Sequence, residues 1–244
     1  MVIQIESLLA GAARARGVVV VIDVFRAFTT ACLAFRQGAE RIVLFERVDH
    51  AQAFAATQPG SVLLGEVDGA KPAGFDFGNS PAEIDGVDFT GKTLVQSTRA
   101  GTTGVTRTKR ATQVLAASLQ NARATAEFLM AAQPDEVTLV AMGWAGEFRT
   151  EEDELCALYI RNLVQGHELP VDALRAVILA SKEAQKFGDP RTPQFAVGDL
   201  DRCLAIDAAR YAIRVEQEQI GGRPLPVVRP VTDDTCYARI AHSA

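Results

Sequence analysis

Residues 17–23, GVVVVID, form the stretch that most constrains how this chain can fold. An extended strand alternates its side chains between two faces, so this run of valine and isoleucine places β-branched apolar groups on both. Neither face can be left in water, and the strand therefore belongs in the middle of a sheet that helices cover on both sides. Asp23 then lies at the carboxyl end of a central strand, where open α/β sheets bind their ligands.

Strands and helices alternate along the rest of the chain. Apolar runs predict further strands over residues 1–5, 41–45, 61–64, 93–96, 112–116, 136–142 and 211–215, and a proline-containing edge strand over 225–228. Helical patterns run up to residue 37 and over 49–56, 121–132, 150–164, 171–181 and 199–205. This order is typical of a layered α/β domain with a largely parallel or mixed sheet. No linker clearly divides residues 1–244, so we expect one domain, with 182–198 as the best candidate for a boundary between subregions.

The composition excludes several classes of protein. With 48% hydrophobic and 23% charged residues the chain is globular in composition, and its net charge of −5 without a basic cluster argues against nucleic-acid binding. The longest apolar run, residues 18–22, is far shorter than the roughly 20 residues of a membrane span, and no signal-peptide pattern opens the chain. The four cysteines form no CxxC pair, which argues against a zinc knuckle or a disulfide framework. We expect a cytoplasmic protein without a membrane partner.

Residues 91–104, GKTLVQSTRAGTTG, predict a turn, a buried strand and a loop of hydroxyls and glycine that opens a helix. Such a loop directs backbone N–H groups and hydroxyls to one point, and a cation within it adds charge, which together suit an anion such as phosphate. The alternative is an ordinary joint whose hydroxyls cap the helix. The residues concerned are Ser97, Thr98, Arg99, Gly101 and Thr102.

Carboxylates follow three other strands at their carboxyl ends: Asp23 with Arg26 beside it, Glu66, and the pair Glu152 and Asp153. Acids gathered in one cleft repel one another unless a cation lies among them, and carboxylate oxygens suit Mg²⁺. A structural alternative exists for the last pair, because Thr150 and Asp153 have the spacing of a helix capping box.

Two further features bear on this site. Residues 69–81, GAKPAGFDFGNSP, carry three Gly and two Pro, which predicts a long irregular loop that either serves function or only makes turns through Asp76 and Asn79. His50, His167 and His242 lie in helix or tail contexts, so we expect them at the surface and do not expect zinc as the metal.

Five segments together resemble the 2-phosphosulfolactate phosphatase family of the coenzyme M pathway: IDVFRAFTT at 22–30, LLGE at 63–66, GFDFGNSP at 74–81, STRAGT at 97–102 and EEDELCA at 151–157. The resemblance extends from about residue 17 to 215 in the expected order, and GFDFGNSP is its most specific motif. It implies a Mg²⁺-dependent acid phosphatase with a three-layer α/β/α fold, a homodimeric assembly, and a small phosphorylated and sulfonated hydroxy acid as substrate.

The resemblance also implies roles for particular residues. Asp23 and Glu66 fall on acidic motif positions and are candidate metal ligands, together with Glu152 and Asp153. Asp23, Arg26 and Glu66 are the candidate catalytic residues, and whether Asp23 holds metal or acts as base or nucleophile stays open. The family often has Asn where Arg99-Ala100 stands here. The positions expected to hold phosphate or substrate are Arg26, Asn79, Ser80, Ser97, Thr98, Arg99, Gly101 and Thr102.

Three hypotheses therefore stand. In the first, the protein hydrolyses a small phosphorylated hydroxy acid, 2-phospho-3-sulfolactate, to 3-sulfolactate and phosphate. In the second, the same scaffold binds a phosphorylated ligand without turnover. In the third, the acids at the strand ends only cap helices in a structural or interaction domain.

Overall fold

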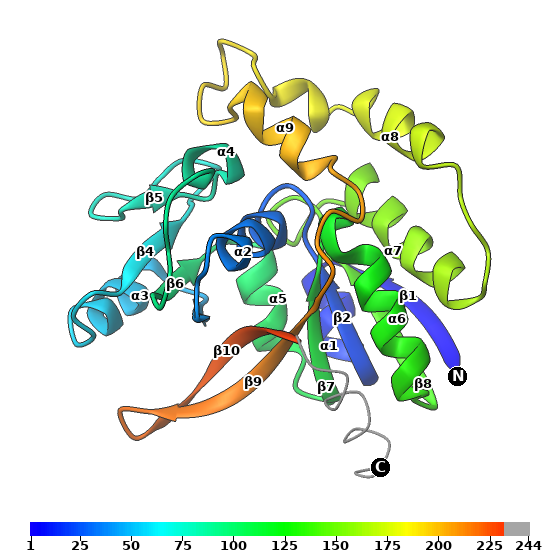
Figure 1. Ribbon diagram of the computed structural model, residues 1–244, viewed down its shortest axis with the longest axis horizontal. Helices are drawn as coiled ribbons and strands as arrows, with labels where there is room; N and C mark the ends of the chain where they lie inside the picture. The colour runs from blue at the N-terminus through cyan, green and yellow to red at the C-terminus, as the bar shows by residue number, and fades with distance from the viewer. Residues whose placement is uncertain (232–244) are drawn as a thin grey trace.

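A computed structural model describes residues 1–231 of the chain; His242 and Cys236 lie outside the described residues. These residues form one ten-stranded mixed sheet with helices on both of its faces (Figure 1). The strands are β1 Val2–Ser7, β2 Gly17–Ile22, β3 Arg41–Phe45, β4 Val62–Gly65, β5 Phe77–Gly78, β6 Thr93–Ser97, β7 Ala111–Ala117, β8 Glu136–Ala141, β9 Ala212–Ile220 and β10 Arg223–Val231.

The sheet consists of two parallel groups joined by a hairpin. Its strand order is β1-β8-β2-β7-β9-β10-β3-β6-β4-β5. Strands β1, β8, β2 and β7 pair in parallel, as do β3, β6, β4 and β5. The hairpin β9–β10 lies between the groups and is antiparallel to both β7 and β3. The predicted α/β class with a mixed, largely parallel sheet is confirmed.

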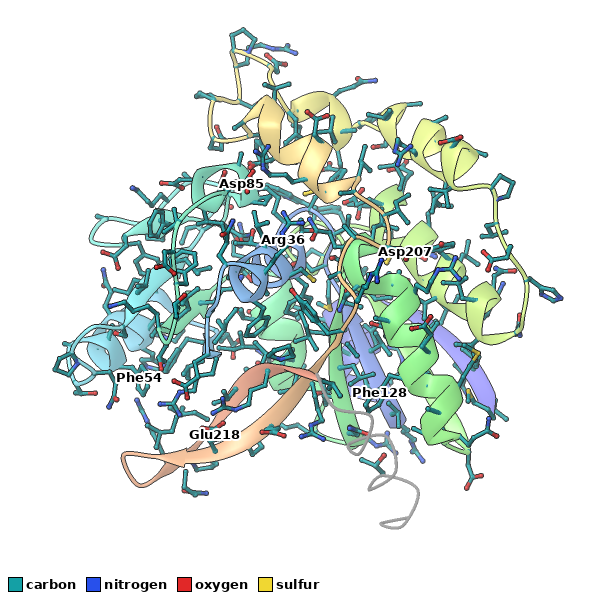
Figure 2. The ribbon with its side chains drawn as sticks, in the orientation of Figure 1. Arg36, Phe54, Asp85, Phe128, Asp207 and Glu218 are labelled. Atoms are coloured by element: carbon teal, nitrogen blue, oxygen red, sulfur yellow. The ribbon has the colours of Figure 1, made fainter. Side chains whose placement is uncertain are left out.

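The valine run of β2 is buried on both faces, as its sequence predicts. Val19 and Val21 pack in one apolar cluster with helices α1, α2 and α5, whereas Val18, Val20 and Ile22 pack in another with α6 and α7. A third cluster lies under α3 at the other end of the sheet. Figure 2 labels Phe128 of α6 and Phe54 of α3, which belong to the second and third clusters. Helices on both faces of the sheet make the three predicted α/β/α layers.

The helices follow the predicted positions closely, although α5 is short and α9 begins two residues early. Among residues 1–231, no helix has the length and apolar character needed to cross a bilayer. The helices are α1 Leu8–Arg14, α2 Ala27–Arg36, α3 Val48–Ala55, α4 Pro81–Ile84, α5 Gly101–Arg107, η1 Leu119–Asn121, α6 Ala122–Ala132, α7 Glu151–Val164, α8 Val171–Leu179, η2 Ala184–Lys186 and α9 Val197–Cys203.

The prediction of an edge strand at 225–228 is wrong, because β10 is an interior strand. It pairs with β9 along its whole length and with β3 at Val227 and Val228. Pro224, Pro226 and Pro230 are separated by even numbers of residues, so their backbone nitrogens all point to the same side of the strand. These nitrogens carry no hydrogen and cannot donate a hydrogen bond. That side faces away from β9, toward the short contact with β3. Prolines are tolerated inside this sheet because β3 pairs only between them.

Candidate functional site

The site lies where the carboxyl ends of strands from both parallel groups meet. Strands β2 and β8 come from one group, and β4 and β6 from the other. Their following loops surround a pocket with about 390 Å³ of empty space, counting the part open to solvent. The pocket is lined by Asp23, Phe25, Arg26, Glu66, Asp68, Gly69, Asn79, Arg99, Ala100, Gly143, Trp144, Ala145 and Phe195.

Asp23 is bound at the N-termini of two helices. Its Oδ1 accepts from the backbone N–H of Ala27 at 3.0 Å, and its Oδ2 accepts from that of Gly101 at 2.8 Å. These are the first residues of α2 and α5, whose dipoles favour a negative charge. Burial nevertheless raises the pKa of Asp23 to about 6, and the nearby charge of Glu66 acts in the same direction.

Glu66 ties the loop after β4 to the loop after β6. Its Oε1 accepts from the backbone N–H of Arg99 at 2.8 Å, and its Oε2 accepts from that of Gly69 at 2.7 Å. The Glu66 N–H in turn donates to the carbonyl of Ser97 at 3.0 Å. The carboxylate thus fixes the spacing of two loops that are about thirty residues apart in sequence.

Glu152 and Asp153, at the start of α7, are buried beside the pocket but do not line it. Asp153 accepts from the N–H of Val24 and of Gly143, both at 2.7 Å, and so joins the ends of β2 and β8. The structural alternative of a capping box is not observed: the Thr150 side chain makes no cap, and the Asp153 carboxylate accepts from those two backbones instead.

These two carboxyls have strongly perturbed pKa values. Burial, followed by the charges of Glu152 and Asp23, raises the pKa of Asp153 well above its ordinary value. Glu152 is 3% exposed, and its Oε2 has no hydrogen-bond partner. Burial raises its pKa to about 8, with a smaller contribution in the same direction from Glu183 and Asp23. The site therefore holds more acid than its hydrogen bonds alone stabilise.

The available ligand atoms fit Mg²⁺ better than a metal ion whose ligands all come from protein side chains. Within residues 1–231, no three His, Cys, Asp or Glu side chains are grouped so as to hold a metal ion. Mg²⁺ characteristically uses one or two protein carboxylates and takes its other ligands from water and phosphate. Asp23 and Glu66 both line the pocket, and each of their oxygens accepts one backbone N–H, which leaves acceptor capacity free. His50 and His167 are exposed, as predicted.

Arg26 lines the pocket, but its guanidinium is engaged by the protein. The side chain is buried, and Nη1 donates to Asp199 Oδ2 at 2.6 Å and to the carbonyl of Gln194 at 3.0 Å. Nη2 donates to the carbonyl of Gly69 at 2.9 Å, and Cζ lies 4.9 Å from the centre of the Phe195 ring. One guanidinium therefore joins three segments around the pocket, and its predicted contact with phosphate stays a prediction.

The loop over residues 69–81 is only partly irregular. Phe77 and Gly78 form the short strand β5, which the sequence does not predict. Asn79 follows it and is buried in the pocket lining. Ser80 caps α4 by accepting from the Glu83 N–H at 3.1 Å, and it donates to Asp199 Oδ1 at 2.6 Å. Ser80 is thus engaged outside the pocket.

In the loop after β6, two hydroxyls bond within the loop itself. Thr98 Oγ1 accepts from the Thr102 N–H at 3.1 Å, and Thr102 Oγ1 accepts from the Thr98 N–H at 2.9 Å. Both residues are buried, as is Ser97, and none of the three lines the pocket. This arrangement matches the capping alternative for the hydroxyls.

Gly101 stands in the same loop, at a position that tolerates no side chain. A Cβ there would lie 2.8 Å from Asp23 Oδ2 and 2.9 Å from the Cβ of Ala27. The absence of a side chain lets the Gly101 N–H reach the carboxylate. The glycine thus serves Asp23 rather than opening the loop to an anion.

The predicted site residues therefore divide into two sets. The pocket brings together Asp23, Arg26, Glu66, Asn79 and Arg99. The residues that do not line it are Ser80, Ser97, Thr98, Gly101, Thr102, Glu152 and Asp153.

An aromatic wall is one part of the pocket that the sequence does not predict, and the lining residue Asp68 is another. Trp144 and Phe195 line the pocket with ring centres 5.9 Å apart, and Phe187 packs edge-on against Phe195 at 5.5 Å. Lys186 places Nζ 4.0 Å from the centre of the Trp144 ring. Phe195 and its neighbours Lys186 and Phe187 come from residues 182–198, the segment expected between subregions. The available signal was Trp144 itself, which lies among glycines directly after a strand end.

Comparison with known proteins identifies the family of the chain. Residues 4–192 match the family described as 2-phosphosulpholactate phosphatase. A protein of Bacillus subtilis (strain 168) named "Probable 2-phosphosulfolactate phosphatase" is 34% identical over 203 residues, which cover 82% of this chain and 87% of that protein. A protein of the same name from Synechocystis sp. (strain ATCC 27184 / PCC 6803 / Kazusa) is 40% identical over 148 residues, 60% of this chain and 61% of the relative. The chain belongs to the 2-phosphosulpholactate phosphatase family.

Proposed function

We propose that this protein is a Mg²⁺-dependent phosphatase that hydrolyses 2-phospho-3-sulfolactate to 3-sulfolactate and phosphate. The observation that carries the proposal is the convergence of Asp23 and Glu66, from the two parallel groups of strands, on one pocket with Arg99. The family and the names of its members supply the substrate. A homodimer, a cytoplasmic location and a place in the coenzyme M pathway belong to the same proposal.

Hydrolysis exchanges one bond to phosphorus for another. The oxygen of a water molecule bonds to phosphorus while the bond from phosphorus to the lactate oxygen breaks, and that oxygen takes up a proton. Enzymes accelerate such reactions by up to about 10²¹, or roughly 28 kcal/mol. A helix N-terminus supplies at most about 2 kcal/mol, so the chain's dipoles alone fall far short.

The residues divide this task between them. Asp23 and Glu66 would hold the Mg²⁺, which when bound neutralises charge on the phosphoryl oxygens and makes a bound water more acidic. Glu152 and Asp153 lie close enough to Asp23 for the charges of these carboxyls to influence one another. Trp144 and Phe195 exclude water from one side of the pocket. The described chain thus supplies the ligands, the electrostatic setting and the walls of the site.

Phosphate release from 2-phospho-3-sulfolactate, with Mg²⁺ or with a chelator, tests this proposal. We expect turnover in Mg²⁺ that the chelator abolishes, and a loss of at least about 100-fold in kcat for Asp23→Asn. The matched control is Asp76→Asn, an exposed carboxylate outside the pocket lining that also accepts a backbone N–H. No phosphate release with any divalent metal would contradict the proposal.

Thermal unfolding separates the two alternatives. Stabilisation by inorganic phosphate without turnover would support the non-hydrolytic binding protein. An unfolding midpoint that neither Mg²⁺ nor phosphate changes would support the structural hypothesis.

A further inference from the structure

An ion pair between Arg99 and Asp68 lies in the lining of the pocket. Of the residues that line the pocket in the described part of the chain, Arg26 and Arg99 are the cations. The side chain of Arg26 is 2% exposed and bound to Asp199. The side chain of Arg99 is 42% exposed, and that of Asp68 is 66% exposed. Arg99 is therefore the cation in this lining that a ligand can reach.

The backbones of the two partners are held in place, although their side chains are exposed. The Glu66 carboxylate accepts from the N–H of Arg99 and from that of Gly69, the residue after Asp68. The Gly69 carbonyl also accepts from Arg26, and the turn is closed by two hydrogen bonds between Val67 and Ala70. The spacing between the Asp68 turn and the Arg99 loop is thus fixed, and only the two side chains need to rotate for the pair to separate.

An exposed ion pair of this kind contributes little to stability and separates easily. A guanidinium that binds an anionic ligand inside a pocket gains more, because charge-assisted hydrogen bonds strengthen where water is excluded. A substrate with an anionic oxygen group in addition to its phosphate can therefore displace Asp68 from the Arg99 guanidinium. The substrate of the proposed function carries two such groups, a carboxylate and a sulfonate.

We propose, on the basis of the proposed function, that Arg99 binds the anionic group next to the phosphate ester and that Asp68 competes with this group for the guanidinium. Asp68 is then a specificity-determining residue. Asp68 is paired with Arg99 in the free enzyme, and a phosphate ester that has no second anionic group does not displace it.

The test compares kcat/KM for four phosphate monoesters: 2-phospho-3-sulfolactate, 2-phospholactate, O-phosphoisethionate and 4-nitrophenyl phosphate. They carry, in that order, both groups, the carboxylate alone, the sulfonate alone, and neither. We expect Arg99→Gln to lower kcat/KM by about 10- to 100-fold for esters with the group that Arg99 binds, and by less than about 3-fold for 4-nitrophenyl phosphate. Asp68→Asn should lower KM for the same esters.

Controls come from a second exposed ion pair, which Arg107 of α5 makes with Glu46 outside the pocket lining. Arg107→Gln and Glu46→Gln should leave all four values unchanged. An equal loss for every ester in Arg99→Gln would overturn the proposal, because the arginine would then serve the phosphoryl group. A higher KM in Asp68→Asn would overturn the role of competitor.

Calorimetric binding of 3-sulfolactate, which contains no phosphate, separates this inference from the proposed function. If the wild type binds 3-sulfolactate, and Arg99→Gln weakens that binding while Asp68→Asn strengthens it, the inference stands even for a protein without turnover. If the wild type turns over 2-phospho-3-sulfolactate but neither variant alters the binding of 3-sulfolactate, the inference fails and the proposed function survives.

Discussion

Replacement of Asp199 by alanine should destabilise the protein far more than removal of a neighbouring exposed carboxylate. Asp199 is fully buried, its Oδ2 accepts from Arg26, and its Oδ1 accepts from Ser80 Oγ at 2.6 Å and from the Ala82 N–H at 2.9 Å. The substitution leaves the guanidinium of Arg26 buried without its counter-ion. Breaking a buried pair in this way costs about 3–5 kcal/mol, a large part of the 5–15 kcal/mol by which typical domains are stable.

Urea unfolding measures this cost. With a slope of about 3 kcal/mol per molar urea, a loss of about 4 kcal/mol lowers the midpoint by about 1.3 M. The matched control is Asp85→Ala, labelled in Figure 2, whose partially exposed pair with Arg202 also joins α4 to α9. That change should cost about 0–1 kcal/mol.

The double variant Arg26→Met with Asp199→Leu should recover part of the loss, because no unpaired charge stays buried. Equal effects of Asp199→Ala and Asp85→Ala would refute the reasoning, since Arg26 would then be accessible to water. If inorganic phosphate restores the stability of the Asp199→Ala protein to urea, Arg26 can instead bind the phosphoryl group.

Two other predictions concern the carboxylates. Gly101→Ala should displace Asp23, lower kcat at least about 10-fold and reduce stability by about 1–3 kcal/mol. In the control Gly104→Ala the new Cβ would meet the flexible end of Met142, so stability should fall while kcat stays unchanged. Equal kcat values in the two variants would contradict this prediction. Because the pKa of Glu152 is raised from 4.5 to about 8, the folded state binds the extra proton, and stability without Mg²⁺ should fall as pH rises through that range, by up to about 1.4 kcal/mol per unit. Glu152→Gln should flatten this decline in urea unfolding between pH 5 and 8, and an unchanged slope would show that Glu152 does not cause it.

The parts of the fold that the sequence predicts are those set by local patterns. The continuous apolar run of β2 requires helices on both faces of the sheet, and the structure has them. The placement of Asp23 and Glu66 in one pocket follows from the rule that ligands bind at strand ends. The position of each residue at a strand end is a local inference, whereas the meeting of the two strand groups depends on β9 and β10.

The remaining parts depend on partners that no local pattern reveals. Arg26 resembles a phosphate ligand in sequence, but its counter-ion Asp199 lies 173 positions away. In sequence, Thr98 and Thr102 fit an anion site and a helix cap equally well, and only the folded structure shows that they bond each other. Aromatic residues in an irregular segment give no periodicity, so the cover that Phe195 makes over the pocket was not predictable.

The position of the hairpin β9–β10 has a consequence for biosynthesis. The chain leaves the first parallel group after β2, builds the second with β3 to β6, and returns to the first with β7 and β8. Within residues 1–231, the two groups become neighbours in the sheet only through β9 and β10, which follow all the other described strands in the chain. Nascent chains that end before residue 212 contain every carboxylate of the pocket but lack the strands that join the two groups. We therefore expect the pocket to form only after residues 212–231 have been synthesised.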